Sequence, residues 1–150
     1  MSKESLNTKL TELSNKIGNI SVGGGTSSVT TLSKNQIKDA AALTSGSQVS
    51  YVTVGDSLYL GLYLGIADIS QIGRNYIRVC NIASCKTLLN WYYYKDIINV
   101  CGVELAVSMA PNGDAAEVRI EHSDGTTSLK TLTDLNNTII RGVFAFPIAK

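Results

Sequence analysis

The chain has 150 residues, of which 44% are apolar and 17% charged, and its formal net charge is +1. This length suits one domain with an appendage, and the 13 basic residues are scattered rather than clustered. The composition therefore argues against binding to nucleic acid or to an anionic membrane, and the low charge content favours burial of surface in an oligomer.

Targeting signals and cysteine content indicate the cellular compartment in which the protein is made. Residues 1–7 are polar and no apolar signal segment follows them. The longest charge-free apolar run, residues 57–67, is too short to span a bilayer. The cysteines are odd in number, Cys80, Cys85 and Cys101, which predicts free thiols in a reducing compartment. We therefore expect synthesis in the cytoplasm without a signal peptide and without membrane insertion.

The first predicted element is an amphipathic helix within residues 1–22. Its apolar residues are separated alternately by four and three positions, as at the a and d positions of a heptad repeat: Leu6, Leu10, Leu13, Ile17 and Ile20. Two arrangements fit: identical helices from several chains form a bundle, or the helix packs on its own domain. The strict spacing and the three glycines that follow favour the bundle. The mixed Leu and Ile seam, without a buried Asn, is compatible with a homotrimer.

The segment after the helix is predicted to be a hinge, because residues 23–32 are rich in Gly, Ser and Thr. Residues 33–150 then form the main domain. Ser33 and Gln36 have the spacing of a capping box, which predicts a short leading helix that ends before Gly46.

From Gln48 onward, apolar residues recur at every second position, which is the period of β-strands. In residues 58–66 neither face of the strand carries a charge, which predicts cover on both sides; Tyr and Gly alternate on one face and indicate close packing there. Many short segments separated by turns predict a mainly β fold, an antiparallel β-sandwich or a jelly-roll-like domain. The expected strands are residues 48–54, 58–66, 76–82, 87–94, 103–109, 117–122, 129–133 and 138–146.

No set of residues points to catalysis or to a metal. His122 is the only histidine, and its neighbours at residues 123–124 lie in a turn, whereas a catalytic triad needs side chains that converge from different segments. Cys80 and Cys85 lack the second pair and the histidine of a zinc site. The carboxylates in residues 117–121 alternate with an arginine, which is typical of an exposed strand face. We expect no catalytic residue, no metal and no cofactor.

The most distinctive local feature is a run of four aromatic residues, Trp91, Tyr92, Tyr93 and Tyr94. In a strand, alternate members of this run face opposite sides. They form either a patch that stacks on sugars or contacts a protein, or a combination of core and subunit interface. The second interpretation is favoured, because aromatic residues are good strand formers.

The order of a short heptad helix, a hinge rich in Gly, Ser and Thr, and a compact β domain resembles phage head-fibre and short fibre-type virion proteins. The resemblance is architectural and rests on residues 1–31 and on the β character of the rest. No shaft repeat follows the hinge, and there is no His-x-His motif of an iron-binding tip. The resemblance implies a non-enzymatic homotrimer located in the virion. Other virion proteins would anchor its N-terminal helix, and its β domain would be displayed for adhesion to host-surface glycans.

A second hypothesis comes from a different class of protein. A soluble carbohydrate-binding module would need exposed aromatic residues and would not need the heptad. The mass of the native assembly distinguishes the two hypotheses best, because only the first predicts a trimer.

Overall fold

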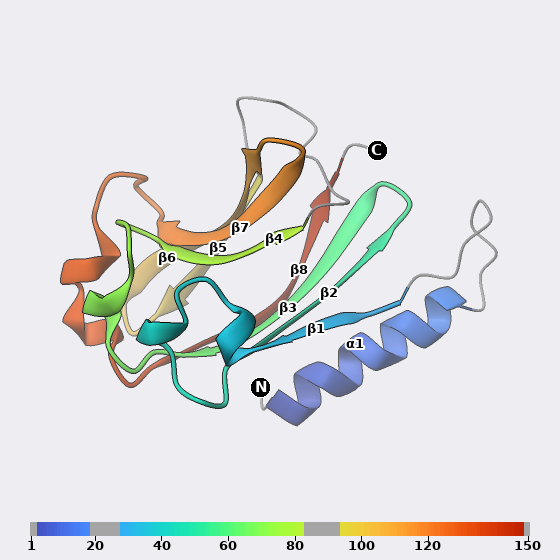
Figure 1. The fold of residues 1–150 in the computed structure, drawn as a ribbon, viewed down its shortest axis with the longest axis horizontal. Coiled ribbons are helices and arrows are strands. Elements are labelled where there is room, and N and C mark those ends of the chain that lie inside the picture. Colours follow the sequence, from blue (N-terminus) through green and yellow to red (C-terminus); the bar gives the residue numbers. More distant parts are fainter. Residues whose placement is uncertain (1–2, 19–27, 83–93, 149–150) are drawn as a thin grey trace.

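The computed structural model describes residues 3–18, 28–82 and 94–148. Over these ranges the fold is mainly β, with two four-stranded antiparallel sheets and one short N-terminal helix, α1 (Lys3–Gly18). The two sheets contribute to one apolar core, so the fold is sandwich-like (Figure 1). The mainly β class predicted from the sequence is confirmed.

The first sheet has the strand order β1-β2-β3-β8. Its members are β1 (Thr30–Ser33), β2 (Gln48–Val54), β3 (Ser57–Gly65) and β8 (Ile139–Pro147). The predicted cover on both sides of β3 is confirmed, because α1 lies on its outer face and its inward side chains are fully buried. These inward residues are Leu58, Leu60, Leu62 and Leu64.

The second sheet has the strand order β4-β7-β6-β5. Its members are β4 (Ile77–Ile82), β5 (Tyr94–Val100), β6 (Val103–Asn112) and β7 (Ala115–His122). Strand β4 pairs with β7 rather than with β5, which is a Greek-key arrangement. The β5–β6 turn consists of Cys101 and Gly102, both with positive φ (51° and 81°), as a type I′ turn requires.

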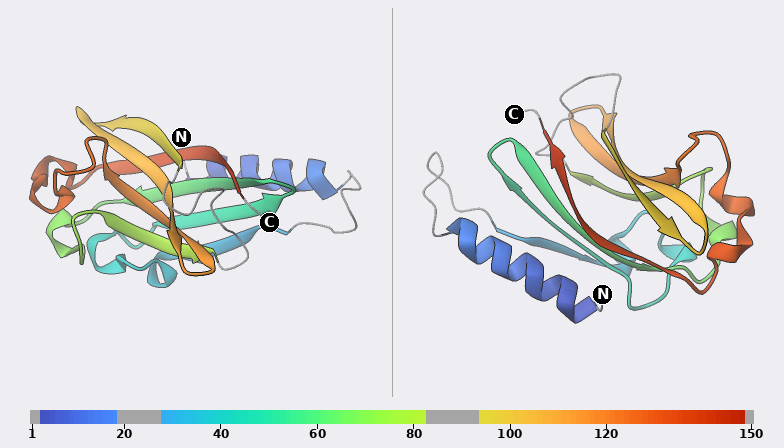
Figure 2. Two further views of the ribbon diagram at one scale, coloured as in Figure 1. Left: turned by 90° about the horizontal axis from the view of Figure 1, so that it is seen from above. Right: turned by 180° about the vertical axis from the view of Figure 1, so that it is seen from behind.

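The two sheets are joined along both edges. On one side, the segment after β1 donates backbone hydrogen bonds to β4, from Lys38 to Val79 at 2.9 Å and from Asp39 to Arg78 at 3.1 Å. On the other side, β5 lies beside β8 (Figure 2). The segment that follows β1 therefore covers the edge of β4.

Helix α1 packs on the outer face of the first sheet, against β2 and β3 (Figure 1). Leu6 and Leu10 are only 3% and 2% exposed, and both lie over Gly61, which has no side chain to keep the helix away. Asn7 and Gln48 exchange amide hydrogen bonds of 3.4 and 3.2 Å between helix and sheet. This is the second of the two arrangements that the sequence allows.

The structure describes less of the rest of the predicted seam. Leu13 is half-buried, whereas the side chain of Ile17 and the whole of Ile20 lie outside the described residues. The first two seam positions therefore serve the chain's own fold. A bundle between chains has only the later positions and other surfaces to use.

Two predictions for residues 23–47 differ from the structure. The segment predicted as a hinge ends inside the sheet, because Thr30–Ser33 forms β1; residues 23–27 lie outside the described residues. The predicted leading helix is instead two 3₁₀ turns, η1 (Lys34–Gln36) and η2 (Ala40–Ala42). Gln36 still accepts a hydrogen bond from the Ser33 N–H at 3.0 Å. The backbone donors that would continue a helix are used by β4 instead.

The strands predicted over residues 129–133 and 87–94 have different outcomes. The strand predicted over residues 129–133 is wrong, because this segment forms the 3₁₀ turns η4 (Leu129–Thr131) and η5 (Thr133–Leu135). Ser128 starts the first of them by accepting the Lys130 N–H at 3.3 Å, a local hydrogen bond that competes with strand pairing. The strand predicted over residues 87–94 lies outside the described residues except for Tyr94, the first residue of β5.

Candidate functional site

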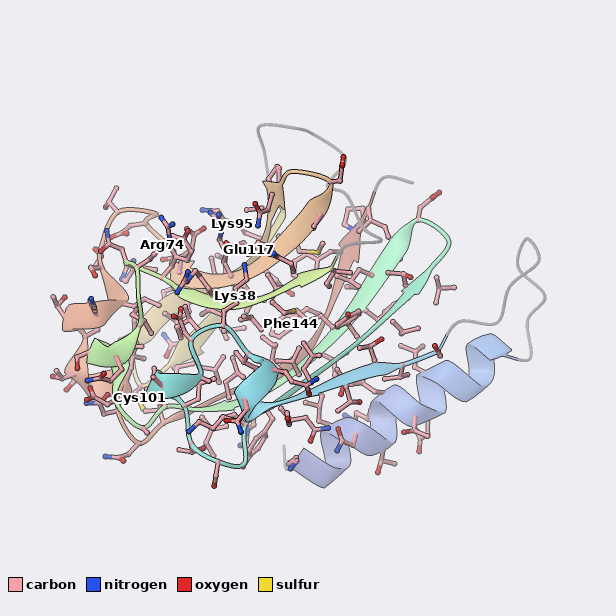
Figure 3. All side chains as sticks on the ribbon, viewed as in Figure 1. Lys38, Arg74, Lys95, Cys101, Glu117 and Phe144 are labelled. Carbon is pink, nitrogen blue, oxygen red and sulfur yellow. The ribbon has the colours of Figure 1, made fainter. Side chains whose placement is uncertain are left out.

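Charged residues gather on the outer face of the second sheet. Along β7, the buried Val118 and Ile120 point into the core, so the residues that alternate with them point outward. The pairing of β4 with β7 places Arg78 opposite Arg119 on this outer side. We call this surface the charged face and define it by Lys38, Arg74, Tyr76, Arg78, Asn112, Glu117, Arg119 and Glu121. Figure 3 labels Lys38, Arg74 and Glu117 there, away from α1.

Glu117 is the central acid of the charged face and is only 4% exposed. The Lys38 Nζ lies 2.5 Å from one of its carboxylate oxygens, and the Arg119 Nε lies 2.6 Å from the other. Burial acts to raise the pKa of Glu117, but the hydrogen bonds and charges of Lys38 and Arg119 together outweigh it. The net pKa therefore lies below the ordinary value, and the carboxylate is held ionised. The sequence pattern had suggested an exposed strand face, which is wrong for Glu117.

A second buried acid, Asp39, organises the loop before β4. Its carboxylate accepts hydrogen bonds from the Arg78 Nη2 at 3.2 Å, from the Arg78 N–H at 2.6 Å and from the Gly73 N–H at 3.2 Å. The hydrogen bond and the charge of Asp39 raise the pKa of Arg78 further. These bonds fix the backbone on both sides of Arg74 and Tyr76, which are thereby held at the rim of the charged face.

Two shallow hollows open on the charged face and share Arg74 and Tyr76 as a common wall. The larger hollow has a volume of about 400 Å³ and the smaller about 270 Å³. The Arg119 guanidinium lies 4.6 Å from the centre of the Tyr76 ring, a cation–π contact that orders both side chains. The larger hollow is completed by Asn75, Glu121, His122, Gly125, Thr126 and Thr127, and the smaller by Lys38, Arg78, Asn112, Glu117 and Arg119.

The smaller hollow has more positive than negative groups. Four cations line it, whereas the carboxylates that neutralise them are Glu117 and Asp39. Glu117 pairs with two of the cations and Asp39 with Arg78. Among the described residues, Arg74 is exposed and has neither an ion pair nor a hydrogen bond for its guanidinium. The arrangement leaves a cation directed at solvent beside a hollow, which is suited to holding an anion.

The predicted residues around His122 form a turn. The His122 Nδ1 accepts the N–H of Asp124 at 3.1 Å. The Asp124 carboxylate in turn accepts the N–H groups of Thr126 and Thr127, both at 2.8 Å, and the Thr127 hydroxyl. These hydrogen bonds lower the pKa of Asp124, led by the one from the Thr127 side chain. The carboxylate is therefore occupied in holding the turn.

The other predicted site residues are the aromatic run and the cysteines. Trp91, Tyr92 and Tyr93 lie outside the described residues, so the aromatic patch stays a prediction. Cys80 is buried and Cys101 is exposed in its turn. In the part of the chain that the structure describes, no three His, Cys, Asp or Glu side chains converge as a metal site.

The charged face was only partly visible in the sequence. The alternation within residues 117–121 marked one strand of it, but Lys38, Arg74 and Arg78 come from other segments and carry no local motif. The composition had suggested scattered basic residues; the fold brings four of them to one hollow. The position of Arg74 depends on the hydrogen bonds of Asp39, which no sequence pattern announces.

The fold and this surface define a sandwich-like β protein with a polar, positively biased surface site. In comparisons with family models, with curated proteins and with solved structures, nothing matches the chain. Within the described ranges, no helix has both the length and the apolar character needed to cross a membrane.

Proposed function

We propose that the chain is a non-enzymatic virion structural protein of head-fibre or short tail-fibre type, which forms a homotrimer and displays its β domain for host-surface adhesion. The observation that supports this proposal best is the placement of two features on opposite sides of the fold. Helix α1 packs on the outer face of the first sheet, whereas the charged face is the outer face of the second sheet. Attachment on the α1 side therefore leaves the charged face free to meet a ligand.

The proposed trimer contact lies beside α1. Leu6 and Leu10 are already used against the first sheet, so subunits must meet through other apolar residues. Ile139 and Val143 of β8 are 41% and 40% exposed and point to the same side of the sheet as α1. Burial of large apolar side chains is the main driving force of such association. We assign the β8 side of the first sheet, together with Leu13, to contact between subunits.

Light scattering on the purified protein tests the trimer. The wild type is expected to have three times the mass of one chain at micromolar concentration. The Val143→Glu variant is expected to form a lighter assembly, because the substitution would bury a charge at the contact. Thr131→Glu, at an exposed residue of η4, is the matched control and keeps the wild-type mass. A monomeric wild type contradicts the proposal.

Removal of residues 1–25 tests the anchor. The truncated protein is expected to remain folded with a β-type circular dichroism spectrum, because none of the described side chains of α1 belongs to the core between the sheets. It is expected to lose attachment to its larger assembly. If truncation unfolds the β domain, α1 is an integral element and the anchor function fails.

The second candidate is a soluble carbohydrate-binding module, and Tyr76 is the observation that favours it. An aromatic ring beside amide, guanidinium and carboxylate groups at two hollows is a set that suits sugars. This candidate needs no trimer. A monomer that binds saccharide through Tyr76 would favour it over the virion protein.

A further inference from the structure

We propose that the smaller hollow of the charged face binds the anionic group, a carboxylate or a sulfate, of an acidic polysaccharide, with Arg74 as its principal donor. The inference rests on the proposed display of this face to a ligand and names the chemical class of that ligand. It concerns residues that lie far from the seam of α1 and from the proposed trimer contact.

The charges in the smaller hollow do not balance. Glu117 neutralises Lys38 and Arg119 only in part, because one carboxylate faces two cations. Arg78 is paired with Asp39 at 3.2 Å. Arg74 adds a further positive charge at the rim, without a partner among the described residues. A ligand anion at this rim gains charge-assisted hydrogen bonds, and no ion pair of the protein must first break.

The charged face also contains acids, and these select among anionic ligands. Glu117 and Glu121 lie on the same strand, on either side of Arg119, so cations and carboxylates alternate over a few ångströms. A ligand with a charge at every unit, such as a nucleic acid, would bring some of its charges against these carboxylates. A polysaccharide with isolated anionic groups and many hydroxyls places the anion at Arg74 and its hydroxyls at the polar groups of the larger hollow.

The larger hollow, next to the smaller one, has groups that suit a sugar. Its wall shares Arg74 and Tyr76 with the smaller hollow, and Asn75, Thr126 and Thr127 add amide and hydroxyl groups. Such groups donate to and accept from sugar hydroxyls, and the Tyr76 ring offers apolar surface to a sugar ring. The two hollows therefore suit consecutive sugar units, one of them charged.

Glu117 occupies, inside the protein, the position of a competing anion. Its carboxylate holds Lys38 Nζ at 2.5 Å and Arg119 Nε at 2.6 Å. Replacement of Glu117 by Gln keeps the shape and frees both cations. The affinity of the hollow for an external anion should then rise, whereas a purely structural role of these charges predicts no such gain.

Isothermal titration of the full chain with oligosaccharides tests the inference. The probes are a hyaluronan oligomer with a carboxylate on every second sugar, a κ-carrageenan oligomer with a sulfate on every second sugar, a neutral dextran oligomer and a single-stranded DNA oligomer. The two acidic oligomers are expected to bind. Comparison of their affinities distinguishes a preference for carboxylate from a preference for sulfate. Arg74→Gln is expected to weaken binding about tenfold, the scale of one charge-assisted hydrogen bond. Glu117→Gln is expected to strengthen it, and Lys130→Gln, at an exposed lysine of η4 that lines neither hollow, is expected to leave it unchanged.

Each contrary result overturns a different part of the proposal. Equal affinity for the acidic and the neutral oligomers would show that binding does not need an anionic group. The proposed adhesion to glycans would still hold. Equal losses in Arg74→Gln and Lys130→Gln, or tighter binding of single-stranded DNA than of either acidic oligomer, overturn the proposed site. No binding of any saccharide overturns the inference, whereas the virion proposal fails separately, on the mass of the assembly.

Discussion

Leu10 of α1 lies so close over Gly61 of β3 that a β-carbon at residue 61 would overlap the leucine side chain. The contact exists because Gly61 leaves a gap in the outer face of β3, and the helix approaches the sheet there. The same β-carbon would lie 3.2 Å from the Leu6 Cδ1. This relationship assigns the first half of the apolar seam to the chain's own sheet, and it can be tested directly.

Gly61→Ala is expected to lower the free energy of unfolding by about 1–3 kcal/mol, because overpacking a close contact forces neighbouring groups to shift. Urea denaturation followed by circular dichroism measures the loss. Gly46→Ala is the matched control, since nothing lies within 4 Å of a β-carbon at that position. In a double-mutant cycle, Leu10→Ala should relieve part of the cost of Gly61→Ala. Strict additivity of the two substitutions would contradict the contact.

Glu117→Gln is expected to lower the free energy of unfolding by about 1–3 kcal/mol at pH 7, because two cations lose a buried partner. The pKa of Glu117 is lowered in the folded protein, so its ionised form stabilises the fold above the ordinary carboxyl value of 4.5. This contribution is lost as the pH falls below that value and through the lowered pKa. Urea midpoints measured from pH 7 to pH 3 should therefore converge for the variant and the wild type. Glu104→Gln, an exposed glutamate of β6, is the control and should change stability little.

Cys101→Asn is expected to stabilise the protein by roughly 0.5–1 kcal/mol, because Asn tolerates positive φ better than Cys in a type I′ turn. Cys101 has φ of 51°, and the turn is completed by Gly102, whose N–H donates to the Asn99 Oδ1 at 3.0 Å. Thermal unfolding of the variant beside Cys101→Ser provides the measurement. A lower melting temperature for Cys101→Asn than for Cys101→Ser would be the contrary result.

The thiols at residues 80 and 101 are expected to differ sharply in reactivity. Burial raises the pKa of the Cys80 thiol to about 12, so at pH 8 its thiolate fraction is on the order of 10⁻⁴. Cys101 is exposed. Iodoacetamide labelling of the native protein, followed by peptide mass spectrometry, should modify Cys101 and leave Cys80 unmodified until denaturant is added. Equal labelling rates of the two thiols in the native protein would show that the core around Cys80 opens readily.

The alternating pattern of apolar residues by itself determined the mainly β class and the inward side of most strands. Leu58, Leu60, Leu62 and Leu64 are buried as the two-residue period requires, and Asp124 with Gly125 marks a real turn. These features are local, because strand alternation and turn chemistry depend on neighbouring residues. The same locality explains the error over residues 129–133, where Ser128 favours a 3₁₀ turn through a hydrogen bond that strand propensity ignores.

Only the tertiary structure decided where the apolar seam of α1 is buried and which charged side chains meet. A heptad spacing states that one side of a helix needs cover, and it does not state whether the cover is another chain or Gly61 of the same chain. The charged face likewise needs Lys38, Arg74 and Glu117, which lie on separate segments and converge because β4 pairs with β7 and with the segment after β1. Long-range pairing of strands brings these charges together, and it is set by the packing of the whole core rather than by any short stretch of the chain.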